Sequence, residues 1–300
     1  MKRLSSLFLL LLSCYACVAQ DDKPARPPIT GIGSVTIDVD DPSRGAVFYM
    51  NLLGFGGGSA VCKGSGKNCL AVNGHQRIDL HMGSHPTDGN FLEEVTFLTS
   101  NIEGLHSYLA GKGVAVSEIM DVPKFNRCFS LTDPEGHRIG FIQYLTAHNH
   151  THEPTQISSH IIHAGFVVHN RAATDHFYKD ILGFRPYWHG GMKDDRDDWV
   201  AMQVPDGTDW VEYMLNIPLD ADKRELGVMN HIALGVHDIY AAQGGLNRNG
   251  WGPGEQPKLG RDGKWQLNIY DPDLTRIEFM EFTPVQKPCC SEYTGPHPKP

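Results

Sequence analysis

Two segments of the chain share an alternation of apolar and polar positions that places a histidine among buried residues. In segment 228–238, His231 shares one face of a predicted strand with Ala233 and Gly235, while apolar side chains occupy the other face. Segment 161–170 repeats this pattern around His163. A single histidine on an apolar strand is usually a core residue with one hydrogen-bond partner. Two matching strands that each present a histidine instead indicate a site built from repeated units.

Longer units of one strand, one helix and several further strands also repeat. The first helix has apolar residues at helical spacing from Ser43 to Leu53 and ends at Gly54. Its residues 48–55, FYMNLLGF, recur as FYKDILGF at 177–184, and TDPEGHRI at 132–139 recurs as YDPDLTRI at 270–277. Further strands are expected at 33–41, 69–72, 77–82, 94–98 and 138–144, with a second helix at 102–113. The chain therefore has four strand–helix–strands modules and an α+β fold.

The modules pair into two domains, which suits a chain of 300 residues. A polar stretch rich in histidine, with His148, His150 and His152, separates the halves and is expected to be a solvated linker. A proline-rich tail follows the last strand and is expected to wrap the surface. The expected organisation is a signal segment at 1–19, an N-terminal domain at 31–146, a linker at 147–159, a C-terminal domain at 160–283 and a tail at 284–300.

The first nineteen residues have the features of a secretory signal. Lys2 and Arg3 precede the apolar run 7–12, and the small-residue pattern at 17–19 predicts cleavage after Ala19. The run is too short to span a bilayer, so no transmembrane segment is expected. The alternative is lipoprotein processing, with a lipid anchor on Cys14. Either route exports the protein to the periplasm or the extracellular space.

Charge and cysteine content narrow the choice of partners. The formal net charge is −9, and removal of the signal with Lys2 and Arg3 moves it to −11. A basic run is absent from the sequence, which excludes nucleic acid as a partner and leaves a small molecule. Export permits disulfides, and Cys62 and Cys69 flank a turn that a bridge would close. For the adjacent pair at 289–290 we expect outward pairing or free thiols.

The modules resemble those of the vicinal oxygen chelate superfamily. The resemblance rests on FYxxxLGF after the first strand of a βαβββ module and on DPD with IE on the last strand, and it covers about residues 31–283. The group includes glyoxalase I, bleomycin resistance proteins, extradiol ring-cleaving dioxygenases, epimerases and fosfomycin-resistance enzymes. It implies two domains of the glyoxalase/dioxygenase type, with a metal in a cup formed by paired modules.

The same resemblance implies a ligand set in the C-terminal half. Its positions on the first and last strands of the modules are His163, Glu212, His231 and Glu278. Two carboxylates in apolar strands are costly unless a cation compensates them, so we expect one divalent ion, Zn, Ni, Fe or Mn. The corresponding positions of the N-terminal half are Ser34, Asp79, Glu94 and Gly140, which implies that this half has lost the metal site.

The ligand set favours one reaction class over another. Four ligands resemble glyoxalase I, in which a ligand glutamate moves a proton between adjacent carbons, with Glu278 as the mobile base and Glu212 as a second catalytic carboxylate. We therefore expect a lyase or isomerase that stabilises an enediolate. Three ligands, His-His-Glu, would match an Fe(II) extradiol dioxygenase, although the histidine expected before the DPD turn is missing. A non-catalytic ligand-binding protein is the third alternative.

Overall fold

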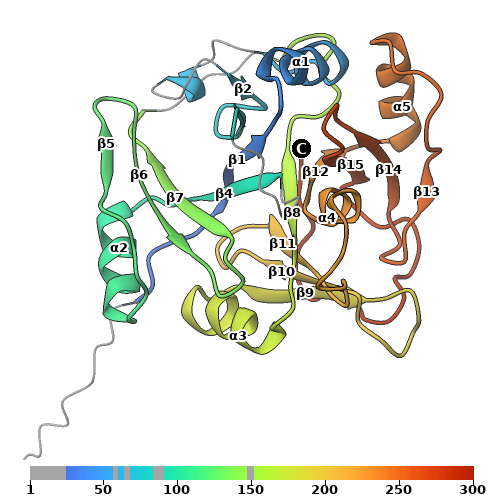
Figure 1. The fold of residues 1–300 in the computed structure, drawn as a ribbon. Helices are drawn as coiled ribbons and strands as arrows, with labels where there is room; N and C mark the ends of the chain where they lie inside the picture. Colours follow the sequence, from blue (N-terminus) through green and yellow to red (C-terminus); the bar gives the residue numbers. More distant parts are fainter. Residues whose placement is uncertain (1–24, 57–59, 64–67, 84–90, 147–151) are drawn as a thin grey trace, which may run out of the picture.

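The computed structural model describes residues 25–300 except 57–59, 64–67, 84–90 and 147–151, and it contains two curved sheets (Figure 1). The first sheet has the order β2-β3-β1-β4-β7-β6-β5. Its strands are β1 (Gly31–Asp38), β2 (Cys69–Ala71), β3 (Arg77–His81), β4 (Leu92–Leu98), β5 (Met120–Val122), β6 (Asn126–Thr132) and β7 (Arg138–Tyr144). The second sheet has the order β13-β14-β15-β12-β8-β11-β10-β9. Its strands are β8 (Ile161–Val167), β9 (Arg185–Gly190), β10 (Trp199–Gln203), β11 (Trp210–Met214), β12 (His231–Val236), β13 (Lys258–Leu259), β14 (Trp265–Tyr270) and β15 (Arg276–Glu281).

Short helices cover the sheets at the positions that the repeated units predict. Two of them, α1 and α3, each continue into a six-residue π-helical turn that contains the first five residues of the FYxxxLGF repeat. Asp41 and Asn170 cap α1 and α3, because each side chain accepts a hydrogen bond from a backbone amide of the first turn. The helices are α1 (Pro42–Ala46), α2 (Ile102–Gly111), α3 (Arg171–Asp175), α4 (Lys223–Met229) and α5 (Ile239–Arg248), with π-helical turns at Val47–Leu52 and His176–Ile181 and a 3-10 turn at Ala60–Cys62. The predicted α+β fold with two domains is confirmed.

The two sheets have the same strand register at their centres. An antiparallel central pair, β1 with β4 or β8 with β12, is flanked on both sides by parallel neighbours. Ser34 pairs with Arg77 as His163 pairs with Trp210, and Thr96 pairs with Gly140 as Ala233 pairs with Glu278. The register therefore agrees with the alignment of the two halves that the sequence repeats gave.

The repeated motifs join the two domains reciprocally. Tyr49, in the first FYxxxLGF motif, donates its hydroxyl hydrogen to Asp271 Oδ2 of the second domain at 3.0 Å. Tyr178, in the second motif, donates to Asp133 Oδ2 of the first domain at 3.1 Å. All four side chains are buried, and each aspartate starts the DP turn of its module. The FYxxxLGF and DP motifs thus form one interface by pseudo-twofold exchange.

One hydrophobic cluster runs through both domains. It contains buried residues of both sheets, and the rings of Phe97 and Phe184 meet edge to face across the interface at 5.3 Å. Aromatic pairs of this geometry add to the stabilisation from buried area. The domains therefore pack as one body with a continuous core.

The linker and the tail are both packed against the domains. In the described part of the linker, residues 152–155 are exposed as expected, whereas Ile157 is partly buried and donates its amide hydrogen to Leu53 O at 3.0 Å; His148 and His150 lie outside the described residues. In the tail, Tyr293 donates to Asp262 O at 3.0 Å, and His160 Nδ1 donates to Lys299 O at 2.6 Å. The tail therefore packs against the second domain, where Tyr293 contacts the ring of Tyr187.

Four of the described cysteines form two disulfides within the chain, and Cys128 is free. Cys62 and Cys69 form the disulfide that the sequence suggested. Cys289 and Cys290 are bonded to each other, so the expectation of outward pairing or free thiols was wrong. Cys290 adopts a φ of +73°, a left-handed backbone conformation that side chains other than glycine rarely take.

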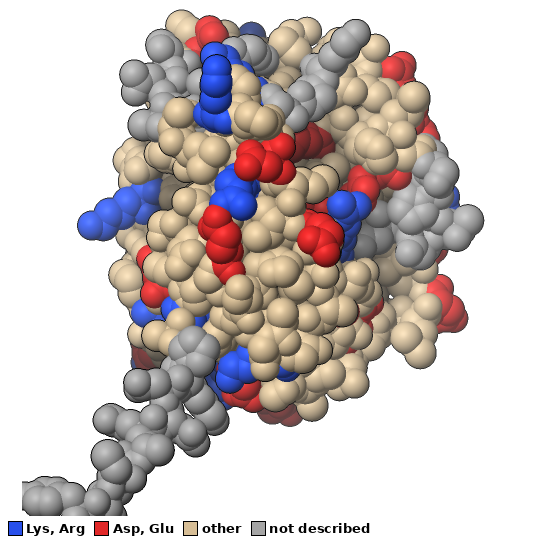
Figure 2. All heavy atoms as spheres, turned by 90° about the vertical axis from the view of Figure 1, so that its left-hand side faces the viewer, with Lys and Arg blue, Asp and Glu red and all other residues tan. Residues whose placement is uncertain are grey.

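Surface charge and helix length are relevant to whether the protein binds nucleic acid or a membrane. Figure 2 shows acidic and basic side chains interspersed over the face of the first domain, without a basic patch on that face. No helix of the described residues is long and apolar enough to cross a membrane. The proposed signal segment, including Cys14 and Ala19, lies outside the described residues.

The reciprocal interface predicts unequal effects of removing its two hydroxyls. Tyr49→Phe should lower the free energy of unfolding by about 1–3 kcal/mol, because Asp271 Oδ2 would lose its partner while buried. Tyr178→Phe should lower it less, since Asp133 Oδ2 keeps the ring nitrogen of His137 at 3.0 Å. Urea unfolding of both variants and the parent protein measures the difference. A larger loss for Tyr178→Phe would contradict this account.

Candidate metal centre

Four neighbouring strands bring the predicted ligands to one face of the second sheet. His163 lies in β8, Glu212 in β11, His231 at the start of β12 and Glu278 in β15. Gly165 lies opposite both Glu212 and His231, and Ala233 lies opposite both His163 and Glu278. Cross-strand partners in register project to the same face, so the two small residues leave the space between the ligands open.

The ligand atoms converge on a common centre. His163 Nε2 lies 3.0 Å from His231 Nε2. Glu278 Oε2 lies 3.6 Å from His163 Nε2 and 3.4 Å from His231 Nε2. Glu212 Oε2 lies 3.8 Å and 3.6 Å from the same nitrogens. Both histidines are fully buried, and every approach is close to the separation of ligands that share one ion.

Gly165 is required for the orientation of His231. A Cβ atom on Gly165 would lie 2.1 Å from His231 Cε1 and 2.3 Å from its Nδ1, so any side chain would displace the imidazole. The ring is also held by its own backbone, because Nδ1 lies 2.9 Å from Met229 O, which can only accept. This bond fixes the proton on Nδ1 and directs the lone pair of Nε2 to the centre.

His163 is oriented by packing instead. Its ring lies 4.7 Å from the indole of Trp210, centroid to centroid, and Nδ1 has no hydrogen-bond partner among the described residues. An imidazole that is fully buried and lacks a partner on one nitrogen needs strong compensation at the other. A cation at Nε2 provides it.

The electrostatics of the cup also suit a cation. Burial lowers the pKa of both histidines, so the imidazoles are neutral. Burial raises the pKa of Glu212, and the charge of Glu278 raises it further. The pKa of Glu278 is lowered despite its burial, because His231 and Arg276 stabilise the charged form. Two neutral nitrogens and two carboxylate oxygens thus form a donor set that fits one divalent ion such as Zn, Ni, Fe or Mn.

The cup opens into a cavity of about 340 Å³. Apolar walls come from Trp188, Trp199 and Met280, while Asn268 and Arg276 add polar groups next to the ligands. A small planar molecule fits a cavity of this size, and the indoles can exclude water around it.

Lys264 is a buried cation beside the cup that the sequence did not reveal. Its side chain is fully buried, and Nζ lies 4.9 Å from the ring centroid of Trp210 and 5.4 Å from that of Tyr293. Burial lowers its pKa to about 8, against the opposing effect of Asp262. Residues 260–264, GRDGK, have the composition of an exposed turn, but rings of the second sheet and of the tail, Tyr187, Trp210 and Tyr293, cover the lysine.

In the equivalent cup of the first domain, the acids at the ligand-equivalent positions form ion pairs with arginines. Arg77 Nε lies 2.8 Å from Asp79 Oδ2, and Arg138 Nε lies 2.5 Å from Glu94 Oε2. A Cβ atom on Gly140 would lie 2.5 Å from Glu94 Oε1, so glycine leaves room for this pair. Each acid at a ligand-equivalent position therefore has an arginine on the same strand or on the adjacent one.

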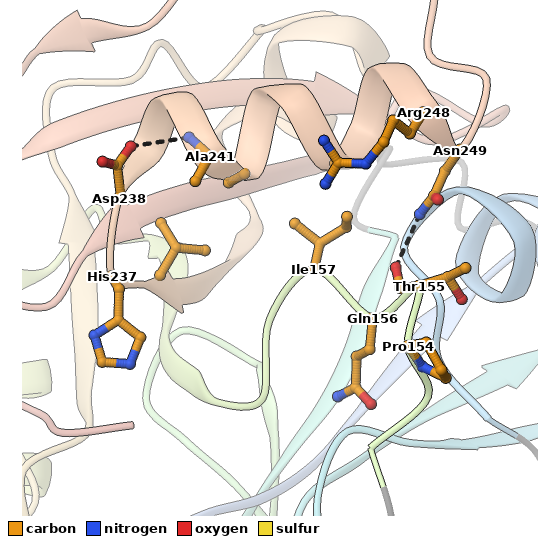
Figure 3. Close-up of a pocket in the computed structure, with 12 residues that line it drawn as sticks. Pro154, Thr155, Gln156, Ile157, His237, Asp238, Ala241, Arg248 and Asn249 are labelled. Atoms are coloured by element: carbon orange, nitrogen blue, oxygen red, sulfur yellow. Dashed lines mark hydrogen bonds between the residues drawn. The ribbon is translucent and has the colours of Figure 1, made fainter.

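A second cavity lies away from the metal cup, where the linker meets α5 (Figure 3). It measures about 450 Å³ and is lined by His237 and Arg248 among others. Asp238 caps α5 through two backbone amides, and Asn249 donates to Thr155 O at 2.9 Å. These polar groups join the linker to the helix and do not converge on a ligand position.

The chain resembles known proteins in its second half and in its whole fold. Residues 160–279 match the family model of the Glyoxalase/Bleomycin resistance protein/Dioxygenase superfamily. No curated protein sequence matches the chain.

Several solved dioxygenase structures share the two-domain fold. Homoprotocatechuate 2,3-dioxygenase from Arthrobacter globiformis has a TM-score of 0.62 at 17% identity, over 86% of this chain and 82% of that one. The 2,3-dioxygenase LapB from Pseudomonas sp. KL28 has a TM-score of 0.63 at 16% identity, over 92% and 96%. A variant of homoprotocatechuate 2,3-dioxygenase from Brevibacterium fuscum has a TM-score of 0.63 at 19% identity, over 91% and 75%.

The two cups predict a single metal per chain. His231→Ala should weaken metal binding by more than the roughly 10–100-fold that follows loss of an outer-shell partner, because it removes a direct ligand. Glu94→Ala, the matched change in the first domain, should leave binding intact. Elemental analysis of the dialysed proteins checks both. Two equivalents, or loss of metal in the Glu94 variant, would show that the first cup also binds.

Metal affinity should also depend on pH through Glu212. Because its pKa is raised in the free cup and a cation beside it favours the ionised carboxylate, whether or not Glu212 is itself a ligand, binding should displace up to one proton at neutral pH. Affinity should rise with pH by up to about tenfold per unit until the carboxylate is ionised, and it should fall as pH decreases. The histidines do not add to this slope near neutrality, since their pKa values are lowered. Calorimetric titration of metal into the parent and into Glu212→Gln checks this, and an equal slope in the variant would exclude Glu212 as the source.

Proposed function

We propose, from the match of residues 160–279 to the Glyoxalase/Bleomycin resistance protein/Dioxygenase superfamily, that this chain is a metal-dependent enzyme that cleaves a ring bearing two adjacent oxygens with O2. The observation that carries the proposal is the triad of His163, His231 and Glu278. Their ligating atoms lie within 3.0–3.6 Å of one another on three adjacent strands. Two histidines and one carboxylate with open positions are typical of non-haem Fe(II) oxygenases.

The architecture supports this reaction class. The triad lies in the second of two domains, and dioxygenases share the fold over 86% or more of this chain. The sequence favoured a glyoxalase-like lyase or isomerase first, whereas the comparisons support its alternative, the dioxygenase, better. The missing histidine before the DPD turn remains a departure from the ring-cleaving enzymes.

The residues of the cup would have different roles in the proposed reaction. His163, His231 and Glu278 would hold Fe(II), which would supply activation of O2 toward a substrate with two adjacent oxygens; both oxygen atoms of O2 enter the product as one C–C bond breaks, so no external reductant is needed. Trp188 and Trp199 would orient the ring and exclude water. Glu212, on the cavity wall, would accept a proton at Oε2 as the diol ionises and return it to the product.

A second candidate follows from the position of Glu212. Its Oε2 approaches both imidazole nitrogens almost as closely as Glu278 does, so it could serve as a fourth ligand. Four ligands leave fewer open positions and suit a glyoxalase-like transfer of a proton between adjacent carbons. The raised pKa of Glu212 and the lowered pKa of Glu278 favour Glu212 as the proton carrier, the reverse of the assignment made from the sequence.

Export is part of the proposal. The Cys62–Cys69 disulfide supports a location outside the reducing cytoplasm, where such bonds persist. Signal cleavage after Ala19 gives a mature protein that starts at Gln20, and a lipidated Cys14 is the alternative. Intact-mass measurement of the exported protein distinguishes the two products.

Two measurements distinguish the two candidate reactions: the dependence of activity on O2 and the effect of Glu212→Gln. With anaerobically loaded Fe(II) and a catechol, the protein should consume one O2 per ring cleaved. Glu278→Gln should reduce the rate by at least about 100-fold through loss of a ligand, whereas Glu212→Gln should retain the metal and part of the rate. An oxygen electrode with a hemithioacetal assay in parallel measures both activities.

Control measurements show which of the three candidate functions an experimental result supports. Glu94→Gln, in the cup of the first domain, should have no effect on either activity. Isomerisation without O2 that requires both Glu212 and Glu278 would replace the dioxygenase by the lyase. Catechol binding without turnover under any metal would indicate a ligand-binding protein.

A further inference from the structure

The disulfide of the tail lies beside the cavity that opens from the metal cup. Arg261, which lines this cavity, donates a hydrogen bond from Nη2 to Cys289 Sγ at 2.8 Å. The amide of Cys289 in turn donates to Arg261 O at 2.8 Å. Cys289 is partly buried and Cys290 is exposed. The disulfide is therefore both in contact with the cavity wall and open to reagents in solution.

A bond between adjacent residues adds little to the stability of the fold. A disulfide stabilises mainly by restricting the unfolded chain, and this effect grows with the number of residues that the bond encloses. Cys289 and Cys290 are neighbours in sequence, whereas Cys62 and Cys69 are 7 residues apart. Cys69 is also buried, while Cys290 is exposed. Because exposed disulfides are the ones that thiols reduce most readily, the tail bond is better suited to redox chemistry than to stabilisation.

Arg261 is placed to stabilise a thiolate on Cys289. A disulfide is reduced faster when the sulfur that leaves is stabilised as a thiolate, and a neighbouring cation has this effect. Arg261 Nη2 lies 2.8 Å from Cys289 Sγ but 3.7 Å from Cys290 Sγ. Asp194 opposes the effect, because it pairs with Arg261 and its Oδ1 lies 3.5 Å from Cys289 Sγ. Cys289 is therefore the better leaving sulfur, and the exposed Cys290 is the one for a thiolate to attack.

The residues of the disulfide also hold one wall of the cavity. Cys289 O accepts a hydrogen bond at 3.2 Å from Nε1 of Trp188, which lines the cavity. Ser291 Oγ accepts from the amide of His189 in β9 and donates to its carbonyl oxygen, both at 2.9 Å. Cys290 has a φ of +73°, which a residue other than glycine rarely adopts without a constraint, and the disulfide supplies one. Reduction removes this constraint and should loosen the contact of the tail with β9.

We propose that Cys289–Cys290 is a redox-active disulfide that a dithiol reductant reduces, and that its state controls the rigidity of the cavity wall at Trp188. A thiolate of the dithiol attacks Cys290 Sγ, the bond between the two cysteines breaks, and Cys289 leaves as a thiolate beside Arg261. The second thiol of the reductant then attacks the reductant's own sulfur in the mixed disulfide, which releases Cys290. The protein gains two electrons and two protons, and the dithiol loses both and becomes a disulfide. The proposal holds for any reaction at the metal cup.

The rate at which thiols form tests the redox site. Reduced thioredoxin, a protein dithiol, is added to the full-length, metal-loaded protein, and the new thiols are alkylated and mapped by mass spectrometry over time. Cys289 and Cys290 should be reduced at least about tenfold faster than Cys62 and Cys69, which serve as the internal control. Equal rates for the two bonds would overturn the proposal.

Variants of opposite charge test the role of Arg261. Arg261→Met should slow reduction of the tail bond by about three- to tenfold, and Arg261→Lys should restore part of the rate because it keeps the charge. Asp194→Asn should speed the reduction, since the guanidinium then no longer faces a competing carboxylate. Arg171→Met removes an arginine that pairs with Asp197 at 2.9 Å, and it should have no effect. An unchanged rate in Arg261→Met, or slower reduction in both Arg261→Met and Asp194→Asn, would contradict the electrostatic role.

Hydrogen exchange tests the link between the disulfide and the cavity wall. In the reduced protein the amides of His189 and Cys289 should exchange at least about tenfold faster, because their acceptors lie across the contact that reduction loosens. The double variant Cys289→Ser, Cys290→Ser should show the same increase without reductant, and the amides of β4 in the first domain should not change in either case. Unchanged exchange at His189 after complete reduction would show that the bond has no influence on the cavity wall and would refute the proposal.

Discussion

The structure depends on the removal of two imidazoles and two carboxylates from water at one point of a sheet. His163 and His231 are fully buried and Glu278 nearly so, which would be strongly unfavourable without compensation. The surrounding chain is arranged to hold these groups together: Gly165 admits the ring of His231, the carbonyl of Met229 fixes its tautomer, and Trp210 packs on His163. A divalent ion would compensate all four groups at once, and we therefore expect metal binding to stabilise the second sheet.

The two domains have the same strand register, but the acids at the equivalent positions have different partners in each domain. In the first domain the acids pair with arginines, Asp79 with Arg77 and Glu94 with Arg138. In the second, histidines at the ends of the central strands leave the acids free to share an ion. The reciprocal bonds of Tyr49 and Tyr178 hold the domains together through motifs that both halves retain. Duplication therefore conserved the interface while the cups diverged in charge.

Buried groups outside the ligand set affect the electrostatics of the cup. Lys264 lies behind Trp210 and next to Tyr293 of the tail, where it balances Asp262 and adds positive field to the cup. On the open side, Arg276 and Asn268 present unpartnered atoms to the cavity. Tyr293 of the tail helps to cover Lys264, which links the last residues of the chain to the electrostatics of the site.

The sequence by itself determined the modules, their pairing into two domains and the candidate ligands. Periodicity and short motifs are local features of the chain, and each of them occurs in both halves. His163 and His231 stand out for that reason, and Glu212 and Glu278 followed from the resemblance to a known superfamily. It could not assign roles to the two glutamates, since their pKa shifts arise from burial and from neighbours on other strands. Lys264, the Cys289–Cys290 bond and the unpartnered atoms of Arg276 and Asn268 were decided only by the tertiary structure. Their burial and pairing depend on contacts between segments far apart in the chain, such as the tail and β14, and no local pattern of residues encodes such contacts.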